Sequence, residues 1–139
     1  MVAKGRILAV DYGKKNIGLA YSDELRLTIQ PMPSLPNRGL RDFLRNLRNT
    51  IQSMEIQELV LGIPINMNGT RGDSVVQMEQ ILETLKAKLE IPLHGVDERL
   101  STVEALEFWR DLSRKQQKKY RTVDSLAAAL ILDRYLKET

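Results

Sequence analysis

The sequence predicts an α/β fold with a five-stranded mixed sheet flanked by helices, and three observations lead to that prediction. Two short apolar runs near the N-terminus are joined by a turn that contains Gly and Asn, which is typical of a hairpin. Later β-rich runs such as "ELVLGIP" alternate with segments of helical periodicity, as in βαβ units. A hairpin followed by such crossovers implies a sheet with both antiparallel and parallel pairs.

The elements follow from these patterns in order. We expect strands at 6–11, 17–22 and 25–31, a helix at 38–54, a strand at 58–64, a helix at 73–89, a strand at 91–98, and two helices that begin near Ser101 and Thr122. Ser101 and Glu104 have the spacing of a capping box, and Thr122 is a plausible N-cap. The segment "PMPSLPNRG" is rich in proline and polar residues, so we expect it to be a loop.

Length and composition restrict the class of protein. A chain of 139 residues with 42% hydrophobic residues fits a single domain, 1–139. No apolar run approaches the roughly 20 residues of a membrane helix, and the N-terminus lacks the apolar region of a signal peptide, so we expect a cytoplasmic protein without membrane contact. With no cysteine and one histidine, thiol chemistry and multi-histidine metal sites are excluded.

Basic residues are concentrated in two segments, although the formal net charge is only +3. The segment "RDLSRKQQKKYR", residues 110–121, holds six basic residues and one acid, and reads as either a solvated loop or a loop that contacts phosphates. In the helix at 38–54 the arginines share a face other than the apolar one: Arg38, Arg41, Arg45 and Arg48. We interpret this stripe as the solvated side of the helix, with contact to a polyanion as the less favoured alternative.

Three acids occupy unusual positions. Asp11 ends the first apolar strand, and Asp97 or Glu98 ends the last one. Sites in open α/β sheets form outside the carboxyl ends of parallel strands, so these acids converge if the two strands are near neighbours. Asp124 shares a helical stripe with apolar residues, which by spacing are Ala127, Ala128, Ile131 and Tyr135.

Each acid alone has a structural explanation, as a turn residue, a strand-end acid or an acid in the first turn of a helix. Together they indicate a divalent cation, because carboxylates brought close resist joint ionisation unless a cation compensates them. Carboxylate ligands select hard cations, so we expect Mg²⁺ or Mn²⁺. Lys14, Lys15 and Arg99 stand beside these acids and could hold a phosphodiester.

The segment "GIPINMNGTRGDS" leads from a strand end into a helix N-terminus. Its glycines, Gly62, Gly69 and Gly72, permit tight turns and positive φ. It is either a plain connection capped by Asp73 or Ser74, or a contact to a phosphate backbone beside the acids.

Four blocks of the sequence resemble the signature blocks of the YqgF family, also called RuvX, in order and spacing. These blocks are "DYGKKNIGLAYSD", "LVLGIPINMNGT", "DERLSTVEA" and "VDSLAAALIL", and they span nearly the whole chain. The family is described as Holliday junction resolvase-like proteins or pre-16S rRNA nucleases with an RNase H-like fold. The chain departs from the family pattern at Asn16, where Arg is usual, and at Asn68 and Arg71, where acids are usual.

The resemblance implies that Asp11, Glu98 and Asp124 are the catalytic, metal-binding acids, with Asp97 as a less favoured alternative to Glu98. It also implies a nuclease acting on structured RNA, processing the 5′ end of pre-16S rRNA in ribosome biogenesis, with branched DNA as the second substrate. The candidate nucleic-acid-binding residues are Lys14, Lys15, Arg99, Arg114, Lys115, Lys118, Lys119 and Arg121.

Two other functions stay open. An Asp-x-Gly hairpin also begins the phosphate site of actin-like nucleotide-binding proteins, and the chain could be a non-catalytic RNA-binding assembly factor. A symmetric junction resolvase needs two active sites and hence a homodimer, whereas an RNA nuclease can be a monomer.

Overall fold

A computed structural model describes residues 4–64, 72–98, 102–123 and 125–138. The elements are β1 (Arg6–Tyr12), β2 (Asn16–Ser22), β3 (Ile29–Pro36), α1 (Leu40–Ser53), β4 (Ile56–Ile63), α2 (Asp73–Lys88), β5 (Leu93–Asp97), α3 (Thr102–Asp111), α4 (Arg114–Val123) and α5 (Leu126–Glu138). The five strands form one sheet in the order β3-β2-β1-β4-β5. The predicted five-stranded mixed sheet is confirmed, since β1, β2 and β3 pair antiparallel while β4 pairs parallel with both β1 and β5.

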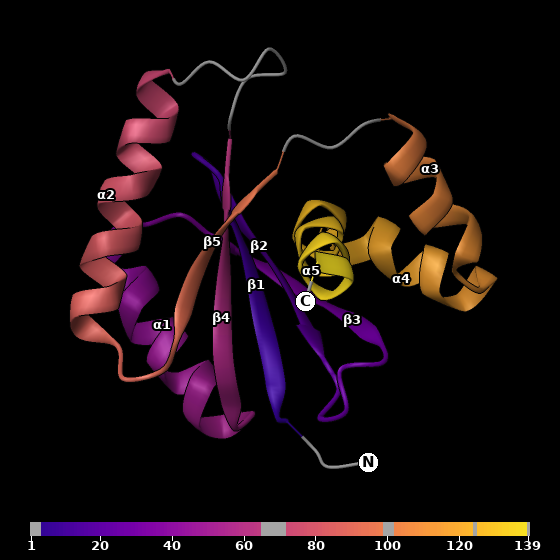
Figure 1. Ribbon diagram of the computed structural model, residues 1–139, viewed down its shortest axis with the longest axis horizontal. Coiled ribbons are helices and arrows are strands. Elements are labelled where there is room, and N and C mark those ends of the chain that lie inside the picture. Colours follow the sequence, from indigo (N-terminus) through magenta and orange to yellow (C-terminus); the bar gives the residue numbers. More distant parts are fainter. Residues whose placement is uncertain (1–3, 65–71, 99–101, 124, 139) are drawn as a thin grey trace.

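Helices cover both faces of the sheet (Figure 1). α1 and α2 lie on one face, where Phe43 and Leu85 pack with Leu8 and Leu59 in the larger apolar cluster. α5 lies on the other face and packs against all five strands, with α3 and α4 beyond it. Because both faces are covered, the middle strands are apolar without alternation, as the run "ILAV" shows.

The proline-rich segment is a strand, so the prediction of a loop there is wrong. β3 covers residues 29–36 and begins later than the expected third strand. Its prolines are tolerated because β3 is an edge strand, with one side of its backbone unpaired. Pro31 and Pro36 pair in register with Ala20 and Asn16 of β2. β3 therefore ends beside the turn that joins β1 to β2.

The basic segment is also not the loop that we expected. Residues 114–123 form the helix α4, so the described residues contain five helices instead of the four expected. α4 is amphipathic: Tyr120 is buried and its hydroxyl donates to the carbonyl of Ile29, while the basic residues are exposed. The expected final helix from Thr122 is corrected as well, because α4 ends at Val123 and α5 begins at Leu126.

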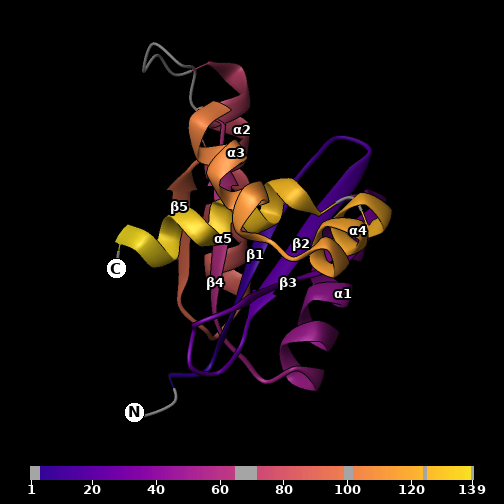
Figure 2. The same cartoon turned by 90° about the vertical axis from the view of Figure 1, so that its right-hand side faces the viewer.

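α5 crosses the sheet, as the side view shows (Figure 2). Ala128 and Ile131 are buried, as the predicted apolar stripe required, but Ala127 is exposed. The close approach of the helix depends on Ala128 and Ala129, which are fully buried against the sheet. No helix within the described residues has the length and apolar character needed to cross a membrane.

Candidate metal site at the carboxyl ends of the strands

Asp11 lies near the end of β1, between two glycines of the neighbouring strands. It pairs in register with Gly18 of β2, and Gly62 of β4 is one step beyond the pair Val10–Leu61. By strand alternation Asp11 shares the α5 side of the sheet with Ala9. Neither glycine carries a side chain, so no side chain of β2 or β4 stands directly beside this carboxylate.

The side chain of Glu98 fills the space above Gly62. A Cβ atom at Gly62 would lie 2.5 Å from the Oε2 atom of Glu98 and 2.5 Å from the Cδ1 atom of Ile131. The backbone of Glu98 is fixed at the end of β5, because its N–H donates to the carbonyl of Ile63 at 3.0 Å. Although β1 and β5 are separated by β4, the glycine lets Glu98 reach toward Asp11.

Asp97, the alternative to Glu98, belongs to the opposite side of the sheet. It pairs in register with Ile63, and Ile63 packs in the cluster that α1 and α2 cover. Successive strand residues alternate between faces, so Glu98 follows on the α5 side with Asp11. The register therefore favours Glu98 over Asp97 as the partner of Asp11.

The electrostatics of Glu98 are those of an acid beside other acids. Burial, and after it the negative charges of Asp11 and Asp97, together raise the pKa of its carboxyl to about 7. A hard cation held by oxygen ligands would compensate the negative charges of Asp11 and Asp97, which repel the carboxylate of Glu98. The donor set of Asp11 and Glu98 thus fits Mg²⁺ or Mn²⁺.

A third ligand is not found among the described residues. No group of three or more histidines and acids that could hold a metal ion occurs in that part of the chain. Asp124, the predicted third acid, lies outside it, as do Arg99 and the predicted phosphate-contacting residues 65–71.

Ser125 fixes the start of α5 beside Asp11. Its side chain is buried, the backbone N–H of Leu19 donates to its hydroxyl, and that hydroxyl donates to the carbonyl of Met32. Leu19 pairs with Val10, the residue before Asp11. The chain at Ser125 therefore lies one register step from the Asp11–Gly18 pair.

The turn between β1 and β2 carries Lys14 and Lys15, and both side chains are exposed. Gly13 is required there, because a Cβ atom at this position would lie 2.4 Å from the carbonyl oxygen of Asn16. Asn37 holds the turn: its side-chain amide donates to the carbonyl of Gly13, and its backbone N–H donates to that of Lys15, each at 2.8 Å. The two lysines are thus presented at the same end of the sheet as Asp11.

The other predicted basic residues lie on α4: Arg114, Lys115, Lys118, Lys119 and Arg121. All five are exposed. α4 is anchored to the start of β3, where Tyr120 contacts Ile29 and the side chain of Gln116 donates to that of Gln30 at 3.2 Å. This is the opposite end of β3 from Pro36, and only the last turn of α4, which ends at Val123 two residues before Ser125, lies toward the acids.

Sequence reasoning missed the role of two glycines. It considered Gly62 only as a residue that permits a tight turn near the end of the strand, but Gly62 lies inside β4 and leaves room for Glu98. Gly18 was not singled out at all. The available signal was a single glycine inside an apolar strand pattern, which often marks a close approach of other groups.

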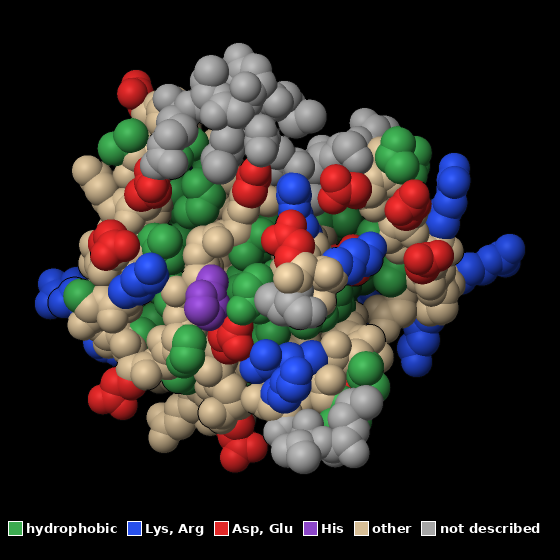
Figure 3. Space-filling model, viewed as in Figure 1, with side chains coloured by type: hydrophobic (Ala, Val, Ile, Leu, Met, Phe, Trp, Pro, Cys, Tyr) green, Lys and Arg blue, Asp and Glu red, His purple; other side chains and the backbone are tan. Residues whose placement is uncertain are grey.

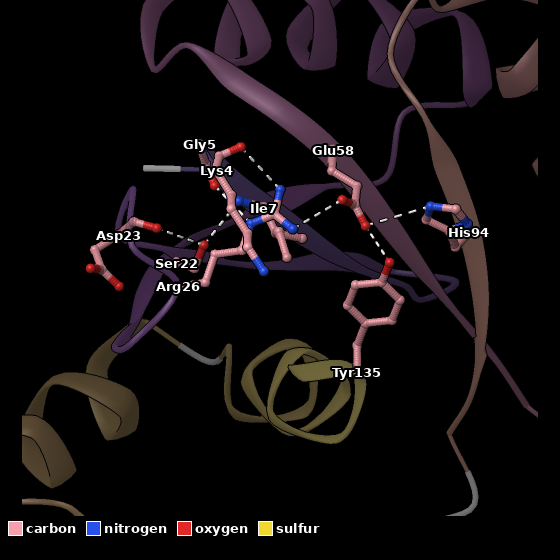
Figure 4. A network of polar contacts seen from close by, with 9 residues as sticks. All are labelled: Lys4, Gly5, Ile7, Ser22, Asp23, Arg26, Glu58, His94 and Tyr135. Atoms are coloured by element: carbon pink, nitrogen blue, oxygen red, sulfur yellow. Dashed lines mark hydrogen bonds and ion pairs between the residues drawn. The ribbon is translucent and has the colours of Figure 1, made fainter. Parts of the chain in front are cut away.

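A second half-buried carboxylate lies on the α5 side of β4 (Figure 4). Glu58 forms an ion pair with Arg26 at 3.2 Å and accepts a hydrogen bond from the hydroxyl of Tyr135. The ring of His94 stacks on that of Tyr135, and its Nε2 atom lies 3.5 Å from Glu58. His94 is visible on the surface as the single purple group (Figure 3). This network ties α5 to β4 and β5 at the end of the sheet away from Asp11.

Solved structures that align with this chain include resolvases. The fowlpox virus resolvase in complex with Holliday junction DNA aligns with a TM-score of 0.59 and 13% identity, covering 96% of this chain and 97% of the other. The Thermus thermophilus RuvC structure in complex with a Holliday junction substrate aligns with a TM-score of 0.55 and 10% identity, covering 96% of each chain. These alignments confirm the RNase H-like fold.

Relatives of higher identity carry the name "Putative pre-16S rRNA nuclease". One from Syntrophomonas wolfei is 38% identical over 133 residues, covering 94% of this chain and 93% of the relative. Another from Koribacter versatilis is 37% identical over 133 residues, covering 96% and 87%. The sequence model of the RuvX family, described as Holliday junction resolvase, matches residues 5–138. The chain therefore belongs to the RuvX family.

Proposed function

We propose that this protein is a divalent-metal-dependent nuclease whose site is built on Asp11, Glu98 and Asp124. The observation that carries the proposal is the carboxyl of Glu98, which lies over Gly62 with Asp11 as its charged neighbour and has a pKa raised to about 7. A perturbed acid beside another acid at the carboxyl ends of parallel strands is typical of a functional site.

Asp11 and Glu98 would hold the cation, and Asp124 would complete the set. The position of Ser125 supports Asp124, since the adjacent residue is fixed one register step from Asp11. When bound, Mg²⁺ or Mn²⁺ polarises a phosphodiester and lowers the pKa of water that attacks it. The strands keep the carboxylates in a fixed geometry, and Lys14 and Lys15 neutralise the phosphate that approaches the turn.

The substrate we propose is structured RNA, cleaved to mature the 5′ end of pre-16S rRNA. The name shared by the relatives from S. wolfei and K. versatilis supports this choice. Arg99 and the basic residues of α4 would then contact the backbone of the same RNA away from the cleaved bond. This function would place the protein in the cytoplasm.

The test is a cleavage assay with matched substrates. The purified protein and Asp11→Asn are incubated with a pre-16S rRNA fragment and with a four-way DNA junction, in Mg²⁺, in Mn²⁺ and in EDTA. We expect cleavage of the RNA that requires metal and is lost in Asp11→Asn. Cleavage in EDTA, or equal cleavage by the variant, would contradict the mechanism; RNA binding without cleavage in any metal would favour an assembly factor.

Junction resolution is the second candidate, because the family description and the structural neighbours name Holliday junctions. It requires two active sites on one junction and therefore a homodimer. Light scattering measures the mass in solution, against 15.9 kDa for one chain. A dimer that cuts the junction symmetrically would favour resolution over RNA maturation.

A further inference from the structure

A basic groove lies between α1 and α2, on the face of the sheet opposite α5. It has a volume of about 850 Å³. Five basic residues and one acid line it: Arg38, Arg41, Arg45, Arg48, Lys88 and Asp42. The arginine stripe, for which the solvated side of a helix is the favoured interpretation from the sequence and contact to a polyanion the alternative, is thus one wall of a concave surface.

The positive charge in the groove is mostly not neutralised. Arg45 pairs with Asp42 at 2.5 Å, and Arg48 donates to the backbone carbonyl of Lys88 at 3.1 Å. Within the described part of the chain, Arg38 and Arg41 make no ion pair and donate no side-chain hydrogen bond. Arginine binds phosphate oxygens through a planar fork of donors, so a row of such side chains suits a polyanion.

The end of the groove at Arg38 lies close to the turn beside Asp11, although the groove is on the face of the sheet opposite the acids. Arg38 directly follows Asn37, which is hydrogen bonded to the turn that presents Lys14 and Lys15 beside Asp11. From there α1 carries the row away from the acids. Arg41 and Arg48 are seven residues apart, which is about 10 Å along a helix and spans roughly three phosphates of one strand.

The surface chemistry favours nucleic acid over a protein partner. Protein interfaces depend on a few large apolar anchors. The large hydrophobic side chains that are exposed among the described residues lie elsewhere: Leu25, Leu27, Val76, Val103 and Leu106. The groove instead offers spaced cations on apolar stems, with Leu40 and Leu44 beneath them.

We propose that the α1–α2 groove binds the sugar-phosphate backbone of the nucleic acid that is cut at Asp11 and Glu98. The strand passes over Lys14 and Lys15 and continues along Arg38 and Arg41 toward Lys88. This subsite rests on the proposed nuclease function, and it extends the contact surface beyond the acids and α4.

The test measures binding of a fluorescent 24-base-pair RNA duplex in EDTA, at several KCl concentrations. Arg38→Ala/Arg41→Ala removes two groove charges without removing a contact of the fold. We expect about tenfold weaker binding at 100 mM KCl, and a salt slope that is shallower by about 1.8, since each lost phosphate contact removes about 0.9. Thermal melting of the variant verifies that it is folded.

The matched control is Lys4→Ala/Lys86→Ala, which removes two exposed charges outside the groove. The control is expected to keep the salt slope of the wild type, as is Arg38→Lys/Arg41→Lys, which retains the charge. An unchanged salt slope in Arg38→Ala/Arg41→Ala, or an equal decrease of the slope in the control, would overturn the proposal that the groove binds nucleic acid. Because binding is measured without metal, failure of the cleavage assay leaves this result interpretable, and a negative result here leaves the nuclease function standing.

Discussion

Two glutamates on the α5 side of the sheet have opposite surroundings, and the contrast distinguishes an acid paired within the fold from the acid that we propose as a metal ligand. Glu58, near the start of β4, meets Arg26 and the hydroxyl of Tyr135. Glu98, at the far end of β5, meets the charges of Asp11 and Asp97, and its pKa is raised to about 7. A partly buried acid with a cation beside it, such as Glu58, stabilises the fold. A partly buried acid with further acids beside it, such as Glu98, does so only when a bound ligand supplies positive charge.

The sharpest test of this contrast compares Glu98→Gln with Glu58→Gln in the cleavage assay. We expect Glu98→Gln to lower the rate of cleavage about 1,000-fold, because stabilisation of transition-state charge by a bound metal is worth several kcal/mol. Glu58→Gln should retain a rate within about threefold of the wild type at a temperature where it is folded. Equal losses in the two variants would remove the distinction between the two acids.

Substitution of Gly62, the glycine under Glu98, is expected to have the next largest effect. In Gly62→Ala the new Cβ meets only the ends of two flexible side chains, Glu98 and Ile131, so the fold adjusts while the carboxylate is displaced. We expect a loss of activity of about 100-fold, as misplacement of a catalytic group by about 1 Å can cause, with little change in melting temperature. A crystal structure of the variant with Glu98 unmoved, or full activity, would contradict this role of Gly62.

Metal affinity should depend on pH through Glu98. Below its pKa of about 7 the carboxyl must lose a proton to bind the cation, so the affinity for Mn²⁺ should rise about tenfold per pH unit from pH 5.5 to 6.5. Above pH 7.5 this rise should level off. Calorimetry measures both regimes. Glu98→Gln should bind more weakly with a flatter profile, and a wild-type affinity independent of pH would argue against Glu98 as a ligand.

The smallest expected effects are on stability without metal, and they have opposite signs. The pKa of Glu98 is higher in the folded than in the unfolded chain, so the free energy of unfolding falls as pH rises from about 4.5 through 7 and stays low above that. Glu98→Gln should therefore gain about 1–2 kcal/mol at pH 8 and little at pH 4.5, after allowance for partial solvent contact.

Glu58→Gln should instead lose about 1–3 kcal/mol at pH 8, because Arg26 and the hydroxyl of Tyr135 keep their places without a charged partner. Urea unfolding in EDTA measures both variants. If the two substitutions shifted stability in the same direction, the two glutamates could not be distinguished as structural and functional.

Much of this fold was predictable because its patterns are local. The hairpin, the buried strand β4 and the helices α1 and α2 follow from apolar spacing and turn residues, and all are present within a few residues of the expected bounds. The two main errors, β3 and α4, concern segments whose own composition favours a loop. The prolines of β3 are acceptable only because the strand lies at the sheet edge, and the basic α4 is held by packing of Tyr120 on β3.

For the site, the sequence by itself determined which acids end the strands: Asp11 at β1, and the pair Asp97 and Glu98 at β5. Only the tertiary structure decided that β4 lies between these strands, that Glu98 and not Asp97 faces Asp11, and that Gly62 opens the space between them. Strand order and register are set by contacts between segments far apart in the chain, and a shift of one residue would exchange the two faces. A local pattern can therefore name the candidate ligands, but the long-range pairing selects which of them meet.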